Sequence, residues 1–115
     1  MDSILTTIKK LVGVSDENDS FDLDIITYIN SAFARLRRLG VGPTNGFRIQ
    51  DATSVWTDFI PENDESVKFE DVKTYVYLKT KLKFDPPTNS TLHAAMENSV
   101  RELEWLLNVD AESDS

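Results

Sequence analysis

The residues of this chain that could do chemistry are few, and their spacing fits no catalytic pattern. His93 is the only histidine and cysteine is absent, so the sequence predicts no Ser–His–Asp or Cys–His nucleophile set. Glu102 and Glu104 stand two residues apart, on different faces of a predicted helix, which does not suit a pair of cooperating carboxylates. Zinc-protease, Walker and dinucleotide-binding glycine motifs are absent as well. We therefore predict no catalytic residue and no cofactor, and we expect that the protein is not an enzyme.

One acidic stretch resembles a calcium-binding loop, because oxygen-bearing side chains alternate along residues 16–24. A calcium loop of this type needs glycine at its sixth position and a bidentate glutamate at its twelfth, where this chain has Phe21 and Thr27. We interpret the stretch instead as the start of a helix, with Ser20 as its cap and two aspartates in the first turn, where the helix dipole favours anions. No metal site is predicted here or elsewhere.

Composition limits both the fold and the partners. A chain of 115 residues with 40% hydrophobic residues can form one domain with a modest core. The absence of cysteine excludes disulfides and thiolate metal sites and fits a reducing cytoplasm. A net charge of −8 argues against a general nucleic-acid-binding protein, which needs a basic face.

No targeting or membrane segment is expected. The first residues, MDSILTTIKKLVGV, carry two lysines in their middle and do not form a signal peptide. No apolar run approaches the roughly 18 residues that a membrane span needs, so we expect no membrane partner.

Apolar periodicity predicts an all-α fold, a small bundle of four to five helices. We expect one helical domain over residues 1–109, with a long irregular internal loop over 41–66 and a disordered acidic tail over 110–115. In the last helix the predicted inner stripe is Leu92, Ala95, Met96, Ser99, Leu103, Leu106 and Leu107. The predicted helices span residues 3–12, 21 or 22 to 39, 69–82, and 90–109, with one or two further turns within 54–60.

The internal loop carries more apolar side chains than a free linker would. Its alternating Phe-Arg-Ile triplet could form a short strand or an extended arm, and a loop of this length is usually functional or mobile. Its apolar residues either fold back on the core or pack onto another subunit, and the sequence leaves both alternatives open. The candidate inter-subunit contacts are Phe47, Ile49, Trp56, Phe59 and Ile60 from the loop, with Arg35 and Arg38 from the preceding helix.

The segment KTYVYLKTKLKFDPP, residues 73–87, predicts a helix with a broad apolar surface and a stiff proline stop. With the helix that follows, it forms a predicted hairpin that must bury surface on more than one side and that holds the second and last helices. Trp105 is expected either at the rim of the core or as a contact residue. The predicted hairpin and packing residues are Tyr75, Tyr77, Phe84, Pro86, Pro87 and Trp105.

Charge is unevenly placed along the chain. Acidic residues gather in 16–24, 51–71 and 110–114, and basic residues gather in 35–38 and 79–83. This separation indicates either solvated faces or charge-complementary contacts between copies of the chain. For the arginines that end the second helix, we favour pairing with the helix dipole and inter-chain salt bridges over phosphate binding.

Several stretches together resemble the small head–tail connector proteins (adaptor or head-completion proteins) of long-tailed bacteriophages and prophages. They are MDSILTTIKKLVGV, FDLDIITYIN, LGVGPTNGFRI, the tryptophan of VWTDF, and KTYVYLKTKLKFDPP followed by RELEWLLNV. The resemblance covers nearly the whole chain, and the KTYVYLKTKLKFDPP segment is its most specific part. The chain departs from the pattern after Val109, where no apolar motif follows.

The resemblance implies a structural protein of the virion neck, made in the cytoplasm of a bacterial host. Copies of such a protein form a ring, generally twelve-fold, beneath the portal protein. The ring extends the DNA channel and docks a tail-side stopper or tail-completion protein, and DNA passes without specific binding.

Two alternatives come from other functional classes. The first is a small acidic binding module, such as an anti-repressor or a DNA-mimic inhibitor, which would order its carboxylates on one face. The second is a small hydrolase, which would need a buried carboxylate or His93 in a deep pocket.

Overall fold

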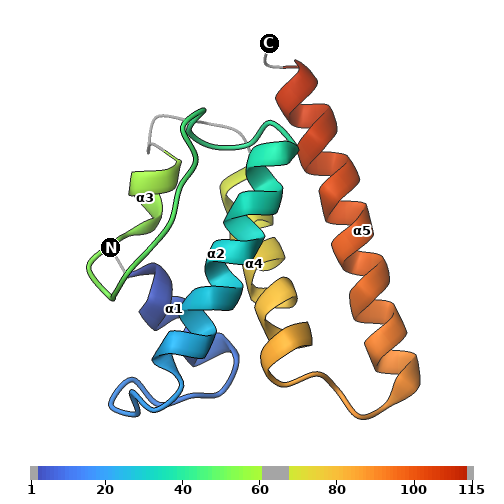
Figure 1. Cartoon of the computed structure of the whole chain (residues 1–115). Helices are drawn as coiled ribbons and strands as arrows, with labels where there is room; N and C mark the ends of the chain where they lie inside the picture. Colours follow the sequence, from blue (N-terminus) through green and yellow to red (C-terminus); the bar gives the residue numbers. More distant parts are fainter. Residues whose placement is uncertain (1–2, 61–67, 114–115) are drawn as a thin grey trace.

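The computed structural model describes residues 3–60 and 68–113, and this part of the chain is a helical bundle without strands (Figure 1). The all-α prediction is confirmed. In chain order the helices are α1 (Ile4–Leu11), α2 (Asp22–Arg38), α3 (Trp56–Phe59), α4 (Lys68–Phe84) and α5 (Ser90–Ser113).

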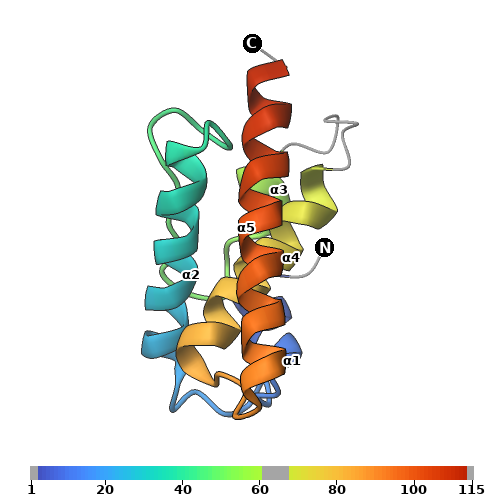
Figure 2. The ribbon, with the colours of Figure 1, turned by 90° about the vertical axis from the view of Figure 1, so that its right-hand side faces the viewer.

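Helix α4 occupies the middle of the bundle. It contacts α1, α2 and α5, whereas α5 packs mainly on α4 and forms one outer side of the molecule (Figures 1 and 2). Because α4 meets neighbours on several sides, apolar residues surround it, and Val72, Tyr75 and Val76 are fully buried. This arrangement agrees with the broad apolar surface expected for residues 73–87 and with their predicted place between the second and last helices.

The N-terminal helix is tied down at both ends. The Ser3 hydroxyl caps α1 by accepting a hydrogen bond from the Thr6 amide (2.9 Å). At its other end the buried Lys9 amine pairs with the Asp22 carboxylate (2.8 Å) and donates to the carbonyl of Asp16 (3.2 Å). This ion pair joins α1 to the start of α2, so a helix too short to persist alone is held by tertiary contacts.

Helix α2 supplies the largest part of the core. Its buried residues recur at the three- and four-residue spacing of an amphipathic helix: Ile25, Ile29, Ala32, Phe33 and Leu36. Gly40 ends the helix with a positive φ of 86° that favours glycine. The Val41 amide then returns a hydrogen bond to the carbonyl of Leu36 (2.9 Å), which turns the chain back along α2.

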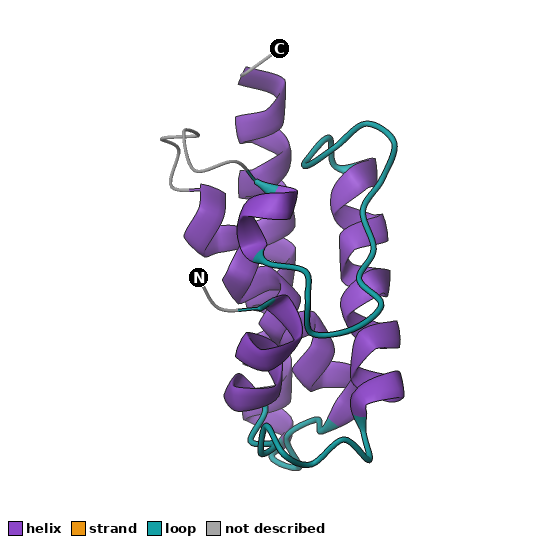
Figure 3. Ribbon diagram, turned by 90° about the vertical axis from the view of Figure 1, so that its left-hand side faces the viewer, coloured by secondary structure: helices purple, strands orange, loops and turns teal. Residues whose placement is uncertain are grey.

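The segment that follows α2 descends along this helix and returns to α3 (Figure 3). Residues 47–49 form no strand; they run as irregular backbone beside α2. The Asn30 side chain replaces a strand partner, because its amide donates to the Ile49 carbonyl (2.9 Å) and its oxygen accepts from the Ile49 amide (2.7 Å). One residue of α2 therefore satisfies both backbone groups of a buried loop residue.

Aromatic packing completes the attachment of the loop. The Phe33 ring lies 4.6 Å from the Phe59 ring, 4.9 Å from the Phe47 ring and 6.4 Å from the Trp56 ring, measured between centroids. The Trp56 indole also donates to the Thr7 hydroxyl of α1 (3.3 Å). These contacts bury the apolar face of the loop in the core of its own chain.

The hairpin between α4 and α5 has the predicted stop. Helix α4 ends at Phe84, the two prolines follow, and Asn89 caps α5 by accepting from the Leu92 amide (2.9 Å). Of the predicted packing residues, Tyr75 is buried, Tyr77 is half-buried, and the Phe84 ring meets the Phe21 ring at 5.3 Å.

Two of the predicted hairpin residues do not pack. Pro86, two residues beyond the end of α4, is exposed. Trp105 is 66% exposed, because Leu103 and Leu107 point toward α4 and the residue between them must point away. Of its two expected roles, the structure excludes the core rim.

The predicted end of the last helix is also wrong. Helix α5 continues beyond Val109 to Ser113, so residues 110–113 are helical rather than disordered, while 114–115 lie outside the described residues. Two contacts hold this extension. The side-chain amide of Asn108 donates to the carbonyl of Leu39 (3.1 Å). The half-buried Ala111 packs against Gly40 so closely that a Cβ atom added to Gly40 would lie 3.2 Å from the Cβ of Ala111.

We predict that Trp56→Ala and Phe59→Ala each lower the free energy of unfolding by about 3–5 kcal/mol, because each truncates a buried aromatic ring. Urea unfolding measures the change. Trp105→Ala is the matched control, and its effect should stay within about 0.5 kcal/mol because the ring is exposed. Equal effects of the three substitutions would contradict the packing described for the loop.

We predict that Asn30→Ala costs about 1–3 kcal/mol, because it leaves the Ile49 amide and carbonyl buried without partners. In the variant, hydrogen exchange should speed up more at the Ile49 amide than at the amides of α4. Asn45→Ala, at an exposed position of the same loop, serves as the control. Unchanged protection of the Ile49 amide in the Asn30 variant would argue against the side-chain clamp.

Candidate interaction surfaces

Titratable side chains do not converge on a catalytic or metal site in the part of the chain that the structure describes. No group of three or more His, Asp or Glu side chains among residues 3–60 and 68–113 could hold a metal ion. His93 is half-buried on α5, and its Nδ1 lies 3.1 Å from a carboxylate oxygen of Glu97 on the next turn. The pocket beside it measures about 280 Å³ and lies open to solvent, unlike the deep pocket that a hydrolase would need.

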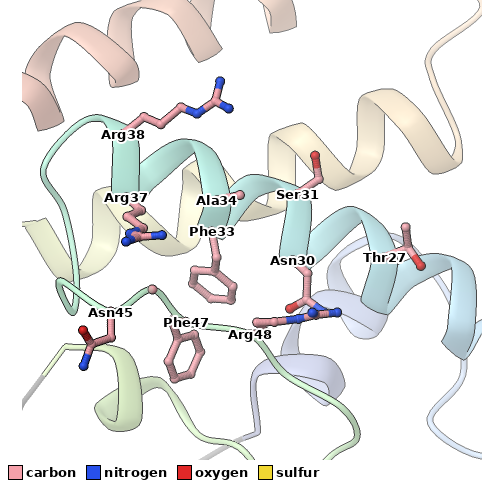
Figure 4. A pocket seen from close by; sticks show the side chains of 11 residues that line it. Thr27, Asn30, Ser31, Phe33, Ala34, Arg37, Arg38, Asn45, Phe47 and Arg48 are labelled. Carbon is pink, nitrogen blue, oxygen red and sulfur yellow. The ribbon is translucent and has the colours of Figure 1, made fainter.

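A cleft with a volume of about 710 Å³ lies between α2 and the descending loop; we call it the arginine groove (Figure 4). The small side chains of Ser31 and Ala34 leave space along the helix, and Phe33 and Phe47 lie at its base. No acidic residue occurs among the described residues that line it. The lining residues are Thr27, Asn30, Ser31, Phe33, Ala34, Arg37, Arg38, Asn45, Gly46, Phe47 and Arg48.

The three arginines of the groove differ in their attachments. Arg37 donates from Nε to the carbonyl of Thr44 (3.1 Å) and so braces the loop against α2. Arg38 and Arg48 are exposed, and no carboxylate of the described residues forms an ion pair with either. The groove therefore combines an aromatic base with positive charge in a chain whose net charge is −8.

A second surface has the opposite charge. The connector before α2 and the first turn of that helix, residues 15–24, form an exposed acidic corner. A hydrogen bond from the Ser15 hydroxyl lowers the pKa of Glu17, which keeps this carboxylate ionised. Leu23 is 78% exposed in the same corner, so the acidic surface also presents a large apolar side chain.

A third surface lies on the side of α5 that faces away from the bundle. Trp105, Leu106 and Val109 are exposed by 66%, 43% and 37%, and they share one side of the helix; we call them the outer strip. Exposed tryptophan in a cluster of apolar side chains is typical of protein contact surfaces. The outer strip is therefore a candidate docking surface.

A partly buried polar contact fixes the orientation of α5 and thus of the outer strip. The Tyr75 hydroxyl of α4 donates to Oε2 of Glu104 (2.6 Å), and Arg35 of α2 lies 3.5 Å from Oε1 of the same carboxylate. Burial, followed by the hydrogen bond to Glu104, raises the pKa of Tyr75 far above its ordinary value. Three helices meet at this one carboxylate.

The candidate contact residues named from the sequence fall into three groups. Phe47 is half-buried at the base of the groove, Arg35 is paired with Glu104, and Arg38 lines the groove. The remaining four are buried in the core of their own chain, which is the first of the two alternatives left open for the loop. These four residues are Ile49, Trp56, Phe59 and Ile60, and in this conformation a neighbouring subunit cannot contact them.

Sequence reasoning did not identify Arg48 or Val109 as surface contacts, and it assigned Leu106 to the inner stripe of the last helix, although this side chain is 43% exposed. The alternation of Phe47, Arg48 and Ile49 could have indicated Arg48, because it places the arginine on the side opposite two inward apolar residues. Leu106 and Val109 lie in a helix with apolar residues on several sides, and there the stripe read from periodicity included one exposed leucine and passed over the neighbouring valine.

Comparison with known families covers almost the entire chain. The profile of the family described as "Phage connector protein" matches residues 4–114. The chain belongs to the phage connector protein family. Connector proteins of this family are structural and not enzymes, and membership supports a head–tail connector role in general, at the neck of the virion and in assembly with other head and tail proteins.

The remaining comparisons add no relative. Neither the curated proteins nor the solved structures contain a match to this connector. Within its described residues, no helix has the length and apolar character needed to cross a membrane.

The raised pKa of Tyr75 predicts how stability depends on pH. Above pH 10, the ordinary pKa of tyrosine, the unfolded chain releases a proton that the folded chain retains, so the stabilising contribution is complete below pH 10 and is lost as the pH rises further. This one group should lower the free energy of unfolding by up to about 1.4 kcal/mol per pH unit.

Urea unfolding of the wild type and of Tyr75→Phe gives the free energy of unfolding of each at about pH 9 to 11. The difference between the two slopes of free energy against pH isolates the contribution of the Tyr75 hydroxyl. The wild type should lose stability more steeply than the variant. Parallel slopes would show that the Tyr75 hydroxyl does not retain its proton in the fold.

Proposed function

We propose that copies of this connector form a ring beneath the portal protein, extend the DNA channel, and dock a tail-side stopper or tail-completion protein. The family match over residues 4–114 carries the proposal. The resemblance described above suggests a twelve-fold ring. Each copy has its loop folded onto its own core, so assembly would use surfaces that are already exposed.

The outer strip is the surface best suited to another virion protein. An exposed tryptophan flanked by two aliphatic residues can supply the desolvated centre of an interface, while the polar residues around it form a rim. The Tyr75–Glu104 contact holds this surface in a fixed orientation, which lowers the entropic cost of binding.

The charge of the chain suits a channel for DNA. With 20 acidic and 12 basic residues, a ring of copies would repel phosphate groups over most of its surface. DNA would then pass without specific binding, and the protein would need neither a cofactor nor a metal ion for this role.

Reconstitution with purified portal protein tests the proposal. The connector should bind the portal as a ring that negative-stain images and sedimentation detect, and it should then capture the tail-side protein. A chain that stays monomeric and joins neither portal nor tail components would contradict the connector role. Recovery of a nuclease or repressor in place of virion proteins would instead favour the acidic binding module.

We predict that Trp105→Ser together with Leu106→Ser weakens binding to the portal or to the tail-side protein by tenfold or more, because it removes the apolar centre of the interface. The unfolding midpoint should change little, since both side chains are exposed. Leu11→Ser alters an exposed leucine on α1 and serves as the control. Normal binding by the outer-strip variant would exclude this surface from the contact.

A further inference from the structure

We infer that the arginine groove of one copy receives the acidic corner of a neighbouring copy of this chain. The inference rests on the proposed function, because it names the two surfaces that would join adjacent copies in the ring. It is carried by the complementary charge and apolar character of the two surfaces.

The groove has the chemistry to hold an acidic segment with an apolar side chain. Arg38 and Arg48 stand exposed on its two sides, one on α2 and one on the loop, and no described carboxylate pairs with them. Guanidinium groups bind carboxylates through paired hydrogen bonds, which makes them suited to such contacts. The half-buried ring of Phe47 offers an apolar surface in the groove, where it packs on the buried ring of Phe33 (4.9 Å between centroids; Figure 4).

The acidic corner presents the matching groups. Asp19 and Asp24 are exposed carboxylates that come before and after Leu23 in the sequence, and the Leu23 side chain is 78% exposed. An exposed apolar side chain close in sequence to two carboxylates suits a cleft that has an aromatic surface and positive charge. Asp22 is excluded from this role because it pairs with Lys9 inside the chain.

Within one chain the acidic corner does not reach Arg38. The corner lies at the start of α2, and Arg38 is the last residue of the same helix, about 25 Å away along its axis. The groove extends along α2 as far as Thr27, but among the described residues no ion pair joins Arg38 or Arg48 to the corner of the same chain. Arg38 can therefore meet only the corner of another copy, and such head-to-tail contacts between unlike surfaces generate rings or filaments.

Charge reversal on each surface tests the pairing. Arg38→Glu with Arg48→Glu reverses the groove, and Asp19→Lys with Asp24→Lys reverses the corner. Each variant alone should associate at least about tenfold more weakly than the wild type, measured by sedimentation and native mass spectrometry with and without portal protein. Lys10→Glu with Lys83→Glu, at exposed positions outside both surfaces, should associate normally.

Recovery of assembly when the two reversed surfaces are combined is the decisive test. An equal mixture of the two reversed variants should assemble again, since every contact in an alternating ring then joins opposite charges. A single chain that carries all four substitutions should also recover. Thermal unfolding of each variant verifies that the bundle is intact, and raised salt should weaken the wild-type assembly.

Each outcome bears on a separate claim. Normal assembly of both reversed variants, or failure of the mixture to recover, would overturn the pairing and leave the connector role standing. A wild type that never associates, even on the portal, would overturn both. Binding of a DNA duplex that depends on Arg38 and Arg48, without rescue by the reversed corner, would show that the groove serves a different ligand.

Discussion

The attachment of the long loop to α2 is the constraint on which the rest of the structure depends. This segment has no strand or helix of its own before α3, so its buried backbone groups need partners from elsewhere. Asn30 supplies them at Ile49, and Phe33 provides the ring against which the loop aromatics pack. Both residues come from one face of α2. The loop is thereby fixed close to the helix, and the space left between them becomes the arginine groove.

The same constraint decides which surfaces are available for assembly. Because Trp56 and Phe59 are buried in their own chain, the candidate contact surfaces are the arginine groove, the acidic corner and the outer strip. Helix α4 connects these surfaces mechanically, since it packs on α2 and on α5 at once. The carboxylate of Glu104 on α5 meets Arg35 of α2 and Tyr75 of α4, and so fixes the angle of the outer strip relative to the groove.

The sequence predicted the parts of this fold that local periodicity encodes. The inner face of α2 and the proline stop after α4 follow from three- and four-residue spacing and from backbone chemistry. The destination of the loop could not be read in the same way, because Phe33 and Phe59 are distant in sequence and periodicity reports only the phase of one helix. On α5 the predicted inner stripe included Leu92, Ala95 and Leu106, which are exposed, and missed Val100, which is buried. The extension to Ser113 depends on Ala111 meeting Gly40, a tertiary contact without a local signal.

Family membership and surface chemistry converge on a structural role in which folded copies meet through preformed surfaces. A cryo-electron microscopy reconstruction of the neck of virions that contain this protein tests that account most directly. We predict a ring of copies in which Trp56 lies in the core of its own chain and Trp105 contacts another virion protein. A neck in which the loop leaves its own bundle and inserts Trp56 into a neighbour, or a neck without this protein, would contradict the account.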